Sequence, residues 1–272
     1  MAKRPPLRVG IAGIGAIGFE LARRLDDGAP GLALTAATAG NAEKAKNRLA
    51  VLSAPPPVCQ IDEMVEMADA IVECAPSGTF LDIAEPVLEA GRIFVPASVG
   101  QLLQHSHLQE LAAARGGRIV VPTGALLGLD AVRAAAEGNL QSVRLITRKP
   151  PTGLAGAPHL RDNQIDVGDL KAPLKVFEGS ARDGIIGFPA NVNVAVALSL
   201  AGLGPDRTSL EIWADPSVTR NTHRIEVEAD SARFTMTIEN VPTEENPRTG
   251  RITALSILAC LKGLVSPLKI GS

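Results

Sequence analysis

Cysteine is scarce in this chain, which has only three among its 272 residues. Cys59, Cys74 and Cys260 are an odd number, lie far apart and form no Cys-x-x-Cys pair. This pattern supports neither a disulfide framework nor a structural zinc site, so we expect no metal centre. Cys74 follows a strand-like segment without a base nearby, and we expect a buried apolar side chain there rather than a nucleophile.

Long uninterrupted apolar runs are also lacking, because glycine, proline or a charged residue breaks each one, and this argues against membrane spans. The formal net charge of -2 gives no basic surface of the kind that nucleic-acid binding requires. The first residues lack the apolar core of a secretory signal. Hydrophobic residues make up 46% and charged residues 21%, which argues against disorder. We therefore expect a cytoplasmic enzyme that binds neither membranes nor nucleic acid.

A glycine-rich turn near the N-terminus lies between a strand-like segment, residues 7–12, and a helix-like segment, residues 19–25. In that context Gly-x-Gly-x-x-Gly is the dinucleotide-binding fingerprint: its glycines allow a tight turn, close approach of a pyrophosphate, and packing of helix on strand. An incidental glycine turn is the competing interpretation. The residues predicted to bind a nicotinamide or flavin nucleotide are Gly13, Gly15, Ala16, Ile17 and Gly18.

The first 122 residues alternate between short apolar strands and helices, which predicts α/β structure with a Rossmann-like, doubly wound parallel sheet. The expected strands are residues 7–12, 32–38, 70–74, 92–97 and 118–122. The expected helices include residues 41–49, 80–90 and 107–115. Ligands bind beyond the carboxyl ends of such strands. We therefore expect Ala75 and Pro76, residues 97–100 and residues 123–125 near the cofactor.

The pattern changes after residue 140, where apolar and polar residues alternate within strands, as in an antiparallel sheet with one solvated face. The expected strands are residues 143–147, 174–178, 210–214, 222–227 and 232–238, with a helix at 192–201. A last helix, residues 249–261, is apolar at Ile252, Leu255, Ile257, Leu258 and Leu261. We therefore expect three parts: a dinucleotide-binding domain (1–122), a mainly antiparallel α+β catalytic domain (123–247), and a C-terminal helix (248–272) packing back on the first.

The stretch after the second strand bears on the choice of coenzyme. NAD-preferring sites place an acidic residue about 20 residues beyond the first glycine to bind the ribose hydroxyls. Residues 36–41 contain no acid. Lys44 with Arg23 or Arg24 is a candidate partner for a 2'-phosphate, although these cations also suit solvated helix faces. We expect the cofactor to be NAD or NADP, with NADP accepted.

Three sets of residues in the second half of the chain are candidates for catalytic or binding roles. Asn191 and Asn193 bracket a helix start, where they cap backbone amides or hold a nicotinamide carboxamide. His223 enters a strand, as a structural residue or as a proton carrier beside hydride transfer. Arg248 and Thr249, expected at a helix N-terminus, form a candidate carboxylate site or an ordinary capped helix start. The remaining histidines, expected at the surface, are His105, His107 and His159.

Several separate motifs in the same order make the chain resemble the L-aspartate dehydrogenase family along nearly its whole length. The segments that carry the resemblance are residues 13–18, 122–131, 187–195, 215–223 and 239–256. The resemblance implies NAD(P)-dependent oxidation of L-aspartate, a small dicarboxylate amino acid, to iminosuccinate, which hydrolyses to oxaloacetate and ammonia. It also implies a homodimer, with His223 matching the catalytic histidine and Ala125 and Asn191 matching cofactor contacts.

Three alternatives remain open at this point. A related NAD(P)-dependent dehydrogenase or imine reductase for another amino acid has a similar plan. A semialdehyde dehydrogenase needs a thiol nucleophile at the domain junction, where this chain has Thr123, Gly124 and Ala125. A dinucleotide-sensing regulator binds the coenzyme without turnover.

Overall fold

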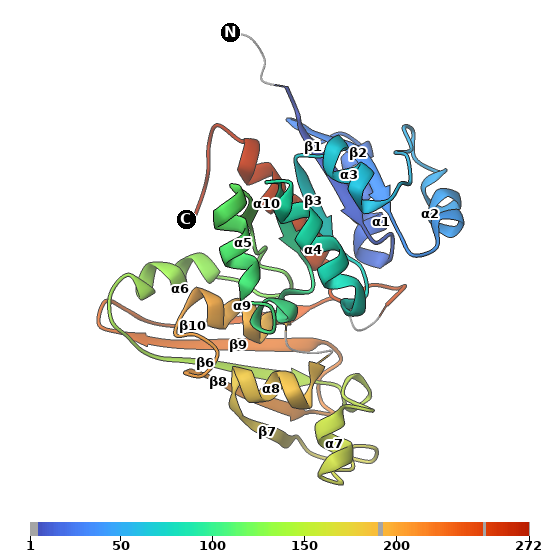
Figure 1. Cartoon of the computed structure of the whole chain (residues 1–272). Helices are drawn as coiled ribbons and strands as arrows, with labels where there is room; N and C mark the ends of the chain where they lie inside the picture. The colour runs from blue at the N-terminus through green and yellow to red at the C-terminus, as the bar shows by residue number, and fades with distance from the viewer. Residues whose placement is uncertain (1–4, 190–192, 247–248, 272) are drawn as a thin grey trace. The chain divides into compact units, whose positions relative to one another are not determined.

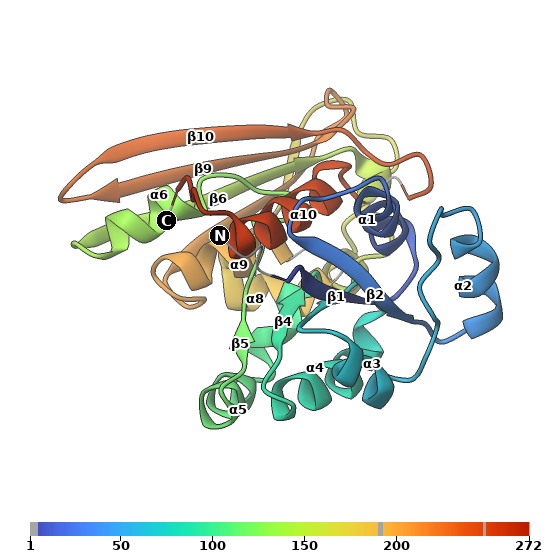
Figure 2. The same ribbon diagram turned by 90° about the horizontal axis from the view of Figure 1, so that it is seen from above.

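The computed structural model describes residues 5–189, 193–246 and 249–271. The chain divides into two compact units, the first formed by Met1–Pro122 and Thr253–Ile270 and the second by Thr123–Ile252 and Gly271–Ser272. Each unit contains its own β-sheet, and Figures 1 and 2 together label the strands of both. Among the described residues, no helix is long and apolar enough to cross a lipid bilayer.

The sheet of the first unit is parallel throughout, with strand order β2-β1-β3-β4-β5. Its strands are β1 (Leu7–Ala12), β2 (Leu32–Thr38), β3 (Ala70–Glu73), β4 (Ile93–Pro96) and β5 (Arg118–Ile119). The predicted Rossmann-like sheet is thus confirmed. The last strand is shorter than the predicted residues 118–122, because after Val120 donates to the Phe94 carbonyl the chain reaches Pro122, which has no N–H to donate.

Helices and core of the first unit follow from the apolar pattern. The helices are α1 (Ala16–Asp26), α2 (Ala42–Leu49), α3 (Ile61–Met67), α4 (Phe80–Glu89) and α5 (His107–Arg115), with short 3-10 turns η1 (Ser77–Thr79) and η2 (Val99–Leu103). Val9 and Ile11 of β1 and Leu21 of α1 are fully buried in one apolar cluster. Because strands of a parallel sheet are covered on both faces, they read as continuous apolar runs.

The last helix, α10 (Ile252–Val265), begins later than the predicted residue 249. Ile257, Leu258 and Leu261 join the apolar cluster of the first unit. Ile252 and Leu255 remain 38% and 39% exposed. The 3.6-residue period of the helix points these two side chains away from its buried stripe.

The sheet of the second unit has the order β10-β9-β6-β8-β7, with β6 and β8 parallel and the other neighbours antiparallel. Its strands are β6 (Leu140–Lys149), β7 (Leu174–Ser180), β8 (Thr208–Ala214), β9 (Asn221–Ala229) and β10 (Arg233–Asn240). Its helices are α6 (Leu129–Ala136), α7 (Pro158–Asp162), α8 (Ala181–Gly187) and α9 (Asn193–Ala201), with the 3-10 turn η3 (Pro151–Gly153). Figures 1 and 2 both show α8 and α9 on the same face of this sheet.

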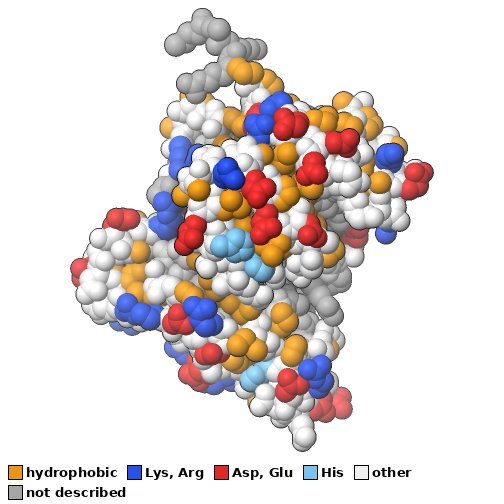
Figure 3. Space-filling view, viewed as in Figure 1, with side chains coloured by type: hydrophobic (Ala, Val, Ile, Leu, Met, Phe, Trp, Pro, Cys, Tyr) orange, Lys and Arg blue, Asp and Glu red, His pale blue; other side chains and the backbone are white. Residues whose placement is uncertain are grey.

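The two faces of this sheet differ in chemistry. Leu145, Ile212 and Ile225 are at most 2% exposed on one face. On the other face, Arg144 pairs with Glu226 and, at short range, with Glu211. Figure 3 shows the side of the molecule on which α8 and α9 cover this sheet, where charged side chains of both signs are interspersed with apolar ones. The alternation predicted from the sequence is thus confirmed.

Candidate active site

The glycine turn after β1 is shaped by contacts that leave no room for side chains at two of its positions. Gly13 has φ +100°, and a Cβ there would lie 2.6 Å from backbone atoms of Cys74 and Ala75. A Cβ at Gly18 would lie 1.9 Å from the carbonyl oxygen of Gly13. These close approaches fulfil the roles expected of the first and third glycines of the fingerprint.

Gly15 differs, because a Cβ there would meet nothing within 4 Å. Gly15 is the N-cap residue of α1 and has no side chain with which to cap the first amides of the helix. The first turn of α1 contains no acidic residue. The first backbone amides of α1, which include those of Ala16 and Ile17, therefore have no side-chain cap from Gly15, and the space beside Gly15 is open. Free amides at the positive end of a helix suit a pyrophosphate, so these residues fit a dinucleotide.

The loop after β3 lies against this turn. Cys74 donates its N–H to the Ala12 carbonyl over 2.7 Å, and the next residue, Ala75, packs against Gly13. Pro76 is exposed and accepts from the Thr79 N–H over 3.0 Å. The fold thus brings Ala75 to the glycine turn, with Pro76 next in the chain. Burial and then the Glu73 charge raise the pKa of the Cys74 thiol, in keeping with an inert apolar residue.

Glu73, the last residue of β3, was missed by sequence reasoning. It is fully buried, and its Oε1 accepts from the Ala75 N–H over 2.9 Å and the Ser98 hydroxyl over 3.0 Å. Its Oε2 accepts from the Ser98 N–H over 2.9 Å. Burial raises the pKa of this carboxyl, against the effect of these bonds. Glu73 therefore braces the loops after β3 and β4, and an acid ending an apolar strand was the available signal.

The segment after β2 contains the residues considered for a 2'-phosphate. Asn41 caps α2 by accepting from the Lys44 N–H over 2.8 Å, and the Lys44 side chain is exposed. Arg23 and Arg24 both bond to Glu20 on α1. For the two arginines, these bonds favour the interpretation as a solvated helix face.

His223 lies on β9 of the second unit, directly opposite Thr147 of β6. It is 3% exposed, and its Nδ1 lies 3.0 Å from the Thr147 hydroxyl oxygen. Burial, and after it the charge of Lys149, lowers the pKa of His223 to about 3. The imidazole is therefore neutral near pH 7 and has a ring nitrogen able to accept a proton.

The side-chain amide of Asn240, on the same sheet face as His223, is bonded to Ala125. Asn240, 4% exposed, donates from Nδ2 to the Ala125 carbonyl over 2.9 Å. Asn240 pairs with Asn221, two residues from His223, so alternation places all three on one face. Among the described residues, Asn240 Oδ1 is a buried acceptor without a hydrogen-bond partner. Asn240 was also missed, because the strand predicted at residues 232–238 stops two residues before it, whereas β10 extends to Asn240.

Two predicted site residues, Asn191 and Arg248, lie outside the described residues. Thr249 is described, and it precedes the start of α10 at Ile252 by three residues. Its N–H donates to Asn246 over 2.9 Å and its carbonyl accepts from Thr243 over 2.8 Å. The expectation that Thr249 lies at a helix N-terminus is therefore wrong, because the chain first forms a tight turn there.

The other histidines are exposed or half-buried. His107 is exposed, with Nε2 3.0 Å from Glu85 Oε1. His105 is half-buried and stacks on Phe80 with ring centroids 6.1 Å apart. His159 is half-buried, with ring centroids 5.4 Å from Phe177 and 5.3 Å from Phe188. His159 thus lies at the surface only in part, because one side of its ring packs in an aromatic cluster.

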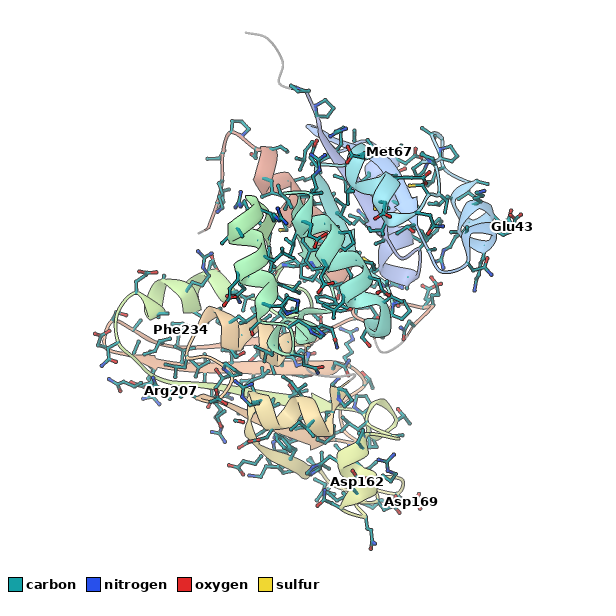
Figure 4. All side chains as sticks on the ribbon, viewed as in Figure 1. Glu43, Met67, Asp162, Asp169, Arg207 and Phe234 are labelled. Carbon is teal, nitrogen blue, oxygen red and sulfur yellow. The ribbon has the colours of Figure 1, made fainter. Side chains whose placement is uncertain are left out.

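His223 is not among the residues that line either of two hollows in the second unit. One, of about 560 Å³, is lined by residues that include Arg144, Arg207 and Phe234. The other, of about 480 Å³, is lined by residues that all lie within the segment 151–168. Figure 4 shows Arg207 and Phe234 at one end of the sheet and Asp162 and Asp169 by α7 at the other. Within the described residues, no group of three or more His, Cys, Asp or Glu side chains is placed to hold a metal ion.

The glycine turn and the Rossmann sheet define a class of protein, the oxidoreductases that use a nicotinamide dinucleotide. Residues 13–122 match the family model described as "Homoserine dehydrogenase, NAD binding domain". Residues 130–264 match the model described as "Aspartate dehydrogenase, C-terminal". The two models together span most of both units.

The chain belongs to the L-aspartate dehydrogenase family. It is 56% identical to an L-aspartate dehydrogenase of Bradyrhizobium diazoefficiens over 266 residues, 98% of this chain and 94% of the relative. It is 50% identical over 273 residues to L-aspartate dehydrogenase 3 of Bordetella bronchiseptica, with 100% of each covered. The crystal structure of an aspartate dehydrogenase from Thermotoga maritima shares the fold, with TM-score 0.77, 23% identity, and 97% and 99% of the chains covered. The resemblance inferred from the sequence motifs is confirmed.

Proposed function

We propose that this protein is an NAD(P)-dependent L-aspartate dehydrogenase. It oxidises L-aspartate to iminosuccinate, which water converts to oxaloacetate and ammonia, and it also catalyses the reverse reductive amination. The observation that carries the proposal is the identity of 56% and 50%, over nearly the full length, to relatives named for this activity. The glycine cradle and the buried neutral imidazole supply the two features that the chemistry needs.

His223 is the proposed acid and base. Oxidation requires the amine to lose a proton, so that its lone pair forms the C=N bond as the α-hydrogen leaves with its electron pair. In our proposal the Thr147 hydroxyl accepts from His223 Nδ1–H, which fixes the ring and leaves Nε2 to take that proton. In the reverse direction the same nitrogen returns the proton.

The coenzyme supplies the hydride acceptor or donor when bound. Gly13, Gly15 and Gly18, with Ala16, Ile17, Ala75 and Pro76, are the proposed contacts in the first unit, and Ala125 and Asn191 those in the second. The absence of an acid in residues 36–41 supports use of NADP as well as NAD. Lys44, which follows the Asn41 cap, is the proposed partner for a 2'-phosphate.

Arg248 and Thr249 are proposed to contact a substrate carboxylate through the guanidinium group and the hydroxyl. This assignment depends on their local chemistry, without a helix dipole, since α10 begins at Ile252.

We also propose a homodimer, as the family resemblance implies. Analytical ultracentrifugation at several protein concentrations tests that state.

The activity is tested by following reduced coenzyme with NAD or NADP against L-aspartate, L-asparagine, L-glutamate and L-alanine. The reverse reaction uses oxaloacetate with ammonia. We expect turnover with L-aspartate to exceed that with the other amino acids. Turnover of another amino acid in preference to L-aspartate, or coenzyme binding without any turnover, would refute the proposal.

A further inference from the structure

Lys149 is a buried cation at the end of β6 that sequence reasoning did not single out. It is 5% exposed, and strand alternation places it on the same face as Thr147. The pairing of Thr147 with His223 brings the imidazole to that face. A Cβ at Gly153 would lie 3.9 Å from both Lys149 Cβ and Asn221 Oδ1. Lys149, His223 and Asn221 therefore share one polar end of a sheet face that is otherwise apolar.

The placement of Lys149 has a definite electrostatic consequence. Lysine is rarely buried, because removing its charge from water is costly. After burial, the charge of Lys149 is the second cause that lowers the pKa of His223. A cation beside the imidazole opposes protonation, whereas the proposed reaction needs His223 to accept a proton. An anion that arrives with the substrate would resolve this conflict.

We infer that the ammonium group of Lys149 binds a carboxylate of the amino-acid substrate beside His223, so that substrate binding itself prepares the imidazole to accept the amine proton. The inference rests on the proposed aspartate dehydrogenase function. A bound carboxylate neutralises the Lys149 charge and lies close enough to favour an imidazolium. The buried cation thus selects a carboxylate-bearing substrate and couples its binding to proton transfer.

The test compares Lys149→Met and Lys149→Gln with the wild type and with Lys171→Met, which removes an exposed lysine of the same unit. Succinate, a dicarboxylate without an amine, is titrated calorimetrically into each protein saturated with NADH or NADPH. Steady-state kinetics with L-aspartate and thermal unfolding are measured in parallel. Lys149→Gln is the second variant, because its neutral polar end suits the polar surroundings of Lys149 if Lys149→Met does not fold.

Loss of a charged hydrogen bond predicts succinate binding weakened by about tenfold to a hundredfold in both Lys149 variants, with a comparable rise in KM for L-aspartate. Coenzyme affinity and the Lys171 variant should match the wild type. Unchanged succinate affinity in the folded Lys149 variants would overturn the inference, and so would absence of saturable succinate binding to the wild type. If the wild type binds succinate but oxidises no L-aspartate, the proposed function fails while the Lys149 variants still test the carboxylate site.

Discussion

Two buried polar groups, Glu73 of the first unit and Asn240 of the second, differ in how completely they are hydrogen-bonded. In the first unit, the carboxylate of Glu73 receives two backbone N–H groups and one hydroxyl. In the second unit, Asn240 Oδ1 is buried without a partner among the described residues, and His223 lies beside the cation of Lys149. A buried group that is fully bonded holds loops in place, whereas one left incomplete is suited to a ligand. Glu73 is thus a bracing residue of the first unit, whereas Asn240 of the second unit keeps an acceptor that a ligand can complete.

Replacing His223 by Ala gives the largest expected effect. Loss of a positioned acid and base should lower kcat by about 10²- to 10⁴-fold, because proton transfer then depends on water. The dissociation constant of the coenzyme, measured by fluorescence titration, should stay within about twofold of the wild type, since the glycine turn belongs to the other unit. Wild-type turnover in the folded variant would remove this imidazole from the reaction.

Gly15 and Gly18 form a matched pair for the scaffold. Gly18→Ala forces a methyl group to 1.9 Å from the Gly13 carbonyl, so we expect the free energy of unfolding to fall by about 1–3 kcal/mol or more. Gly15→Ala fills open space, so it should leave stability unchanged within about 0.5 kcal/mol while weakening coenzyme binding. Urea unfolding and coenzyme titration measure both. Equal loss of stability in the two variants would contradict this division of roles.

Much of the fold was predictable because local pattern determines it. The helix predicted at residues 107–115 matches α5, His107–Arg115, and the strand predicted at residues 7–12 matches β1. The candidate site was harder to predict from the sequence. Thr147 and His223 are 76 residues apart in sequence, and Ala125 and Asn240 are 115 apart. Their contacts depend on strand pairing between distant segments, which periodicity does not report.

The same reason explains which residues escaped notice. Lys149 looks like an ordinary charged residue near a strand end, and Glu73, although it ends an apolar strand, is shown to be buried only by the loops around it. The last helix was predicted to begin at residue 249, three residues before α10 begins at Ile252. Boundaries of helices are set by turns such as that of Thr249, whose bonds to Thr243 and Asn246 are not evident in composition.

Glu73→Gln tests whether the first unit is a completed scaffold. The amide keeps one acceptor but presents an NH₂ group to a donor, so a buried N–H of Ser98 or Ala75 loses its partner. We expect the free energy of unfolding at pH 7 to fall by about 1–3 kcal/mol, measured by urea unfolding. Asp82→Asn, an exposed change in α4 of the same unit, is the control. Unchanged stability of the Glu73 variant would show that the brace is dispensable.

The smallest expected effect is a pH dependence that belongs to His223. Its pKa is about 3 in the folded chain, against about 6.5 when exposed, so the unfolded chain binds the extra proton. The stabilisation is complete above about pH 6.5 and is lost as the pH falls toward 3, by at most about 1.4 kcal/mol per pH unit. His223→Gln should therefore lose less stability than the wild type between pH 7 and pH 5, by on the order of 1 kcal/mol, with His107→Gln, at an exposed position, as control. An equal fall of the urea midpoint from pH 7 to pH 5 in the wild type and in His223→Gln would mean that the imidazole is not held neutral, and the contrast between Glu73 and the second unit would then lose His223.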